Sequence, residues 1–258
     1  MPEFFYYFFS AGPEDGPAEF VNFTLPHFLP ILVAIGLIFL IYFFRNSLRN
    51  QKREIWWRYA LAFIMIISEM SYYWRLIALP ELGPNALDHL PITICGWMTV
   101  FASYMVIGKS QTLFDISYFW CFSSTIFALI TPTVITHTGP TRFRYYQFWV
   151  EHLAGYVALF YMIFVHHMRP TVKSAIKAYI ALAVLGVIAF FANQMLGPGA
   201  NYLFLAAPES TPSLLDILPP NHALRICIMA LAVTVLFFLS YLPWLIMDLR
   251  KKKAAASV

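Results

Sequence analysis

The chain has 258 residues, of which 60% are hydrophobic and only 12% are charged, and its net charge is +4. This composition excludes an ordinary soluble globular domain, in which about a quarter of the residues are charged. The small positive charge predicts no nucleic-acid partner, because the basic residues lie where a membrane protein places them.

Seven apolar runs follow one another along the chain. Each approaches the ~20 residues that an α-helix needs to cross about 30 Å of hydrocarbon. The third and fourth runs are separated only by Gly108–Thr112, which predicts a tight helical hairpin. We therefore expect an all-α polytopic membrane protein with seven transmembrane helices, at His27–Phe44, Trp57–Ala78, Leu90–Ile107, Leu113–Ile130, Tyr145–Val165, Ala175–Leu196 and His222–Met247.

The distribution of Lys and Arg predicts the orientation, because cytoplasmic connections carry an excess of these residues. Thirteen of the 17 basic residues fall on alternate connections and in the C-terminal tail, and the N-terminal segment before the first run has none. The N-terminus is thus expected outside and the C-terminus in the cytoplasm. We expect one transmembrane domain over residues 1–258, with an outer-facing segment (1–25), a seven-helix bundle (26–247) and a basic cytoplasmic tail (248–258). A multi-pass protein of the cell membrane, in bacteria the inner membrane, fits this pattern.

A cysteine and a histidine are expected near the outer ends of two of these helices. Cys95 lies five residues into the third run, or ~7–8 Å, and His152 lies seven residues into the fifth, or ~10 Å. An imidazole at the depth of a thiol could take its proton, and the thiolate could then attack an ester carbonyl. The alternative is that Cys95 is a small apolar filler and His152 an interfacial hydrogen-bonding group.

Several other polar residues lie toward the same outer end, whereas the inner half of the bilayer is predicted to hold no comparable cluster. Intramembrane ionisable residues are costly and usually face the bundle interior or a watery cavity. They could bind substrate, clamp neighbouring helices or line the polar pathway of a transporter or flippase. No spacing of metal ligands is present, and we expect neither metal nor cofactor. The candidate substrate-binding residues are Glu69, Arg75, Arg142, Asn193, Asn201, Tyr202 and Asp216.

Several motifs resemble those of the YwaF-like bacterial membrane proteins. Leu90-Pro91-Ile92-Thr93-Ile94-Cys95 is similar to their Leu-Pro-Leu-His-Leu-Cys signature, although Thr93 stands where that pattern has histidine. The stretch Phe127–Pro132, the aromatic approach Phe148–His152 and the block from Asn193 to Asp216 follow in the same order. These matches run from about Leu90 to Pro219, roughly half of the chain.

The resemblance implies an activity, because animal relatives of these proteins include a multi-span lipid acyltransferase that makes polyunsaturated ether phospholipids. It implies that Cys95 is the nucleophile and His152 the base of a transfer between phospholipids and lysolipids in the outer leaflet. Asn201 and Tyr202 would then donate to the ester oxyanion or headgroup, and Arg75 or Arg142 would hold a phosphate. Neither the residues nor the resemblance indicates an oligomeric state.

Overall fold

The computed structural model describes residues 3–10, 19–132, 138–207, 217–219 and 221–256. Within these residues all regular structure is helical, which confirms the expected fold class. A π-helical turn at Cys121–Thr125 joins α5 to α6, and short 3-10 turns lie at Pro80–Leu82 and Tyr202–Phe204. The α-helices are α1 (Glu3–Phe9), α2 (Leu25–Asn50), α3 (Glu54–Ala78), α4 (Ile94–Gly108), α5 (Gln111–Trp120), α6 (Ile126–Ile130), α7 (Phe143–His166), α8 (Val172–Leu196) and α9 (His222–Ala256).

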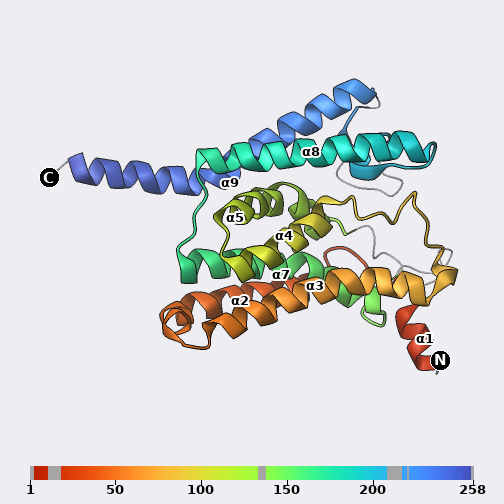
Figure 1. Ribbon diagram of the computed structural model, residues 1–258, viewed down its shortest axis with the longest axis horizontal. Coiled ribbons are helices and arrows are strands. Elements are labelled where there is room, and N and C mark those ends of the chain that lie inside the picture. Colours follow the sequence, from red (N-terminus) through yellow and green to blue (C-terminus); the bar gives the residue numbers. More distant parts are fainter. Residues whose placement is uncertain (1–2, 11–18, 133–137, 208–216, 220, 257–258) are drawn as a thin grey trace.

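The length and composition of these helices are those of a multi-pass membrane protein. Among the described residues, six helical segments are long and apolar enough to cross a bilayer: α2, α3, the continuous segment Gln111–Ile130, α7, α8 and α9. The remaining apolar helix, α4, has 15 residues and so spans about 22 Å. The count of seven crossings and the orientation therefore stay predictions. The two termini lie at opposite ends of the molecule (Figure 1).

Helix α7 is the centre of the bundle. In its most apolar stretch 72% of the residues are buried, against 11% in α2 and α9. It packs against α2, α3 and α4, while α5 packs against α8. Figure 1 shows α8 and α9 along one side of the molecule and α2 and α3 along the other, with α4 and α5 between them. Gln147, Glu151 and His152 of α7 therefore face protein rather than lipid.

The start of the third helix differs from its prediction. Helix α4 begins at Ile94 instead of Leu90, because Pro91 disfavours the helical conformation in the residue before it and cannot donate a backbone hydrogen bond. Thr93 caps the helix through its side chain, which accepts from the Gly96 N–H at 3.1 Å. The predicted hairpin is confirmed: α4 ends at Gly108 and α5 begins at Gln111.

Two further features were not predicted. The fourth run contains the π-helical turn at Cys121–Thr125, which adds a residue to one turn and re-aims the side chains around it. Helix α9 continues to Ala256, so the basic segment predicted as a separate tail from residue 248 is helical as far as the structure describes it. Alanine and lysine are good helix formers, and lysine near a helix C-terminus also complements the helix dipole.

Candidate functional site

A buried pair of carboxyl groups lies between α3 and α7 toward the predicted outer end. Glu69 of α3 and Glu151 of α7 are 6% and 8% exposed, and their carboxyl groups are in direct electrostatic contact. We call them the carboxyl pair. Gly96 of α4 makes room for it, since a Cβ atom there would lie 2.7 Å from Glu69 Oε1. Three helices therefore converge on this pair.

An amide and a guanidinium on successive turns of α7 complete the polar cluster. Gln147 Nε2 donates to Glu151 Oε2 at 2.7 Å and to the Ser68 carbonyl at 3.0 Å. Arg144 lies 3.7 Å from Glu151, donates to Gln147, and has its guanidinium 4.6 Å from the centre of the Tyr72 ring. A carboxyl group in a membrane interior needs such partners. Arg144 was not predicted as a site residue, because the predicted fifth helix begins at Tyr145 and Arg144 fell in the loop before it.

Cys95 lies in the first turn of α4, beside the carboxyl pair. Cys95 as a residue is half-buried, and all three cysteines are reduced. Its electrostatic neighbours are Glu151 and Glu69, and the Thr125 side chain of the π-helical turn lies against it. The Thr125 hydroxyl has no hydrogen-bond partner with proper geometry among the described residues. The thiol is thus next to an unpaired hydroxyl and to the N-terminal end of a helix, where backbone N–H groups favour negative charge.

His152 is buried on α7 in one orientation. Its Nδ1 lies 2.8 Å from the Phe148 carbonyl, and its ring centre lies 4.2 Å from that of Phe148. A carbonyl oxygen can only accept, so Nδ1 carries the hydrogen and, in the neutral ring, Nε2 is the atom that can take up a proton. Nε2 is therefore the ring nitrogen of His152 that can act as a general base.

The helix starts used to estimate the depths of these two residues differ from the predicted ones. Because α4 begins at Ile94 and α7 at Phe143, Cys95 lies one residue into its helix and His152 nine, and their matched depth in the membrane stays a prediction. No hydrogen bond joins the two side chains in the described part of the chain. Glu151 is the charged neighbour that they share. The structure therefore places both residues around the carboxyl pair, and their catalytic roles stay predictions.

The two arginines expected to hold a phosphate bind the N-terminal segment instead. Arg75 Nε donates to the Phe9 carbonyl at 2.5 Å. Arg142 donates to the Tyr7 carbonyl at 2.9 Å and pairs with Glu19 at 2.9 Å. These bonds hold α1 against the neighbouring ends of α3 and α7 (Figure 1). Phosphate binding by either arginine would have to compete with them.

The hydrogen bond from Arg142 lowers the pKa of the Glu19 carboxyl below its ordinary value of 4.5. A lowered folded-state pKa stabilises the docked segment above the ordinary value, and this stabilisation is lost as pH falls through the lowered pKa. We expect α1 to loosen below about pH 4. A nitroxide label attached to a Phe5→Cys substitution, in a Cys227→Ser background, should become more mobile on acidification. The same label in a Glu19→Gln variant should already be mobile at neutral pH, and equal mobility at all pH values in both proteins would contradict the expectation.

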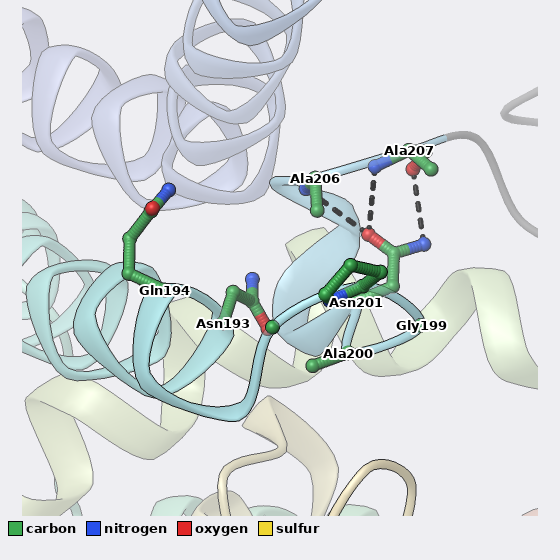
Figure 2. A pocket seen from close by; sticks show the side chains of 9 residues that line it. Asn193, Gln194, Gly199, Ala200, Asn201, Ala206 and Ala207 are labelled. Atoms are coloured by element: carbon green, nitrogen blue, oxygen red, sulfur yellow. Dashed lines mark hydrogen bonds between the residues drawn. The ribbon is translucent and has the colours of Figure 1, made fainter.

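Three more candidate residues organise the outer loop after α8. Asn193 donates to the Tyr202 carbonyl at 3.1 Å and accepts from the Tyr202 N–H at 2.8 Å. The Asn201 side chain accepts from the Ala206 and Ala207 N–H groups, as Figure 2 shows. A cavity of about 470 Å³ is lined by Asn193 and Asn201, together with Ala206 and Ala207.

Tyr202 extends this organisation to the entrance of α4. Its hydroxyl donates to the Ala86 carbonyl at 2.7 Å and accepts from the Leu90 N–H at 2.8 Å. The loop thereby holds the segment that leads to Cys95. Binding of substrate by Asn193, Asn201 and Tyr202 stays a prediction, and Asp216 lies outside the described residues.

The inner half of the bundle does contain polar clusters, so their expected absence was wrong. Glu54, at the start of α3, pairs with Arg58 at 2.9 Å and His166 at 2.7 Å. Asp115 of α5 accepts from Ser174 and Lys177 of α8, both at 2.7 Å. The Glu54–Arg58 spacing of four residues was a readable signal of a helical ion pair. Gln111, four residues earlier, also donates to Asp115, but nothing local indicated Ser174 and Lys177, which are about 60 residues away.

A protein-family model matches residues 22–241, from the start of α2 into α9, and it describes the TMEM164 family. The chain belongs to the TMEM164 family. This match supports a TMEM164-type membrane protein and not the YwaF-like bacterial grouping that the motifs suggested. It includes Glu69, Cys95, Glu151 and His152. No curated protein matches the chain, and no solved structure does. The family assignment establishes a multi-pass membrane protein and leaves the particular membrane a prediction.

Proposed function

We propose that this TMEM164-family protein is a membrane-embedded lipid acyltransferase or transacylase that forms an acyl-Cys95 intermediate. The observation that carries the proposal is the placement of a reduced cysteine in the first turn of α4, with its thiol beside the carboxyl pair. His152 supports it, because its hydrogen bond to Phe148 leaves Nε2 to act as a base. At the predicted outer end of the bundle, the thiol would be near the ester bonds of phospholipids in that leaflet.

The proposed reaction has two balanced halves. In the first, the Cys95 proton passes to His152 Nε2, directly or through a water, and the thiolate attacks the ester carbonyl of a phospholipid. The bond between the carbonyl carbon and the glycerol oxygen breaks, the imidazolium returns the proton to that oxygen, and a lysolipid leaves. In the second half, a lysolipid or other amphiphile loses its hydroxyl proton to His152, and its oxygen attacks the thioester carbonyl. The bond between the carbonyl carbon and the Cys95 sulfur breaks, and the imidazolium returns the proton to that sulfur. Ester exchange of this kind needs no metal or nucleotide.

A non-catalytic transporter or flippase is the second candidate, and the inner clusters favour it because they supply polar groups at both ends. The bundle centre opposes it. Its side chains are apolar and fully buried, and they belong to a single hydrophobic core: Met98, Ala102, Met105 and Met162. Among the described residues, no continuous series of side-chain hydrogen bonds joins the carboxyl pair to Glu54. A carrier should respond strongly to Glu69→Gln and little to Cys95→Ala.

The test of the acyltransferase proposal is an acyl-transfer assay on purified protein in phospholipid nanodiscs with a labelled lysolipid. Cys95→Ala is expected to abolish transfer, because no other residue supplies the thioester. Cys227→Ala is the matched control, since this exposed cysteine lies on α9 away from the cluster, and it should retain activity. Full activity in a folded Cys95→Ala variant would exclude the mechanism.

A further inference from the structure

An apolar groove of about 370 Å³ opens on the lipid-facing side of the bundle, between α2 on one wall and α6 and α7 on the other. Its lining includes Ile31, Ile35 and Ile38 of α2, Ile126 of α6, and Tyr156 of α7. These residues lie in the interior of segments long and apolar enough to cross a bilayer. The groove therefore faces hydrocarbon, and acyl chains are what surrounds it in a membrane.

The polar atoms at the groove are all engaged within the protein. His27 Nδ1 accepts from the Phe23 N–H at 3.0 Å, and Nε2 donates to the Leu129 carbonyl at 2.8 Å. The Tyr156 hydroxyl donates to the Cys121 carbonyl at 2.5 Å. A polar ligand would lose its hydration without finding a partner, whereas a hydrocarbon chain loses nothing on entering. The lining thus selects an aliphatic occupant.

The groove borders the residues that surround the Cys95 thiol. Thr125 lies against the thiol, and the next residue, Ile126, lines the groove. Tyr156 lines the groove with its ring, and its hydroxyl has both Cys121 and Cys95 as electrostatic neighbours. The π-helical turn and Tyr156 are therefore the wall between the apolar space and the thiol.

We propose that this groove binds one acyl chain of a phospholipid, with the ester end toward the wall formed by Tyr156 and the π-helical turn. As a substrate site the groove rests on the proposed acyl transfer, and it would set which chain lengths reach Cys95. Lipid binding in the groove does not itself depend on acyl transfer. Filling the groove should exclude the chain, and enlarging it should admit a longer one.

The experiment is photo-crosslinking in nanodiscs with a phosphatidylcholine that carries a diazirine on one acyl chain, followed by peptide mapping. Crosslinks are expected to concentrate on groove residues of α2 and α6, in the wild type and equally in Cys95→Ser. Ile35→Trp should reduce them several-fold, because the larger ring occupies the groove. Leu37→Trp is the matched control: both positions lie on α2, with exposures of 43% and 46%, but Leu37 does not line the groove.

Crosslinks spread evenly over the lipid-facing side of α2, unchanged by Ile35→Trp, would overturn the proposal and indicate annular lipid only. Ile126→Ala provides a second variant should Ile35→Trp fail to fold, and it should shift capture toward diazirines placed nearer the chain end. An unchanged position preference in Ile126→Ala would count against the groove. Retained groove crosslinking in a wild-type protein that transfers no acyl chain would refute the enzyme while leaving the lipid site intact.

Discussion

The His152→Gln variant is expected to lose acyl transfer by a factor of about 10²–10⁴, the range that general acid–base groups contribute. Glutamine has a similar size and can still donate to the Phe148 carbonyl, but it cannot take up a proton at the position of Nε2. The buried ring makes no other hydrogen bond among the described residues. The fold should therefore tolerate the change, and steady-state transfer rates measured beside helix content by circular dichroism would show it.

His167→Gln is the control for this prediction, since His167 is exposed just beyond the end of α7. It should leave the rate unchanged. Activity near the wild-type level in His152→Gln would show that another group deprotonates the thiol. Glu151, which neighbours both residues electrostatically, would then be the next base to test.

Replacement of Arg58 by alanine is expected to have the largest effect on stability. The guanidinium is buried and donates to both oxygens of Glu54 and to the Val106 and Ile107 carbonyls at the end of α4. Removing one partner of a buried ion pair costs about 3–5 kcal/mol, and Glu54 would then depend on His166 and Tyr161 for its remaining hydrogen bonds. The loss should appear as a lower unfolding temperature in detergent or a lower midpoint in denaturant titration.

Arg53→Ala is the comparison for Arg58→Ala, because Arg53 is exposed and lies just before α3. Its effect should stay within about 0.5 kcal/mol, as for most surface substitutions. Equal midpoints for Arg58→Ala and wild type would contradict the structural role assigned to the inner cluster. Neither substitution touches the carboxyl pair, so the fraction of Arg58→Ala protein that remains folded should still transfer acyl groups.

Local sequence patterns were enough to predict most of the fold. Apolar runs of membrane-spanning length located α2, α3, α7, α8 and the apolar part of α9, and the short Gly108–Thr112 connection predicted the hairpin between α4 and α5. The predicted second and sixth spans end at Ala78 and Leu196, where α3 and α8 end. Hydrophobicity succeeds here because backbone groups in a bilayer leave few alternatives to a helix.

Features that depend on contacts between distant segments could not be predicted in this way. The π-helical turn at Cys121–Thr125 leaves no signal in an apolar run. Arg142 seemed free for a phosphate because its partner, Glu19, is 123 residues away. Asp115 was not recognised as a cluster centre for the same reason. Cys95 and His152 were singled out from the sequence, but only the fold brought the carboxyl pair of α3 and α7 beside Cys95 of α4.

Intact-protein mass spectrometry after incubation with isotope-labelled phospholipids tests the central claim most directly, with wild type compared with Cys95→Ser under rapid quench. The account predicts a labelled adduct of one acyl chain on the wild type alone, and hydroxylamine should remove it because it is a thioester. No adduct with any phospholipid donor, or an adduct that persists in Cys95→Ser, would contradict the account.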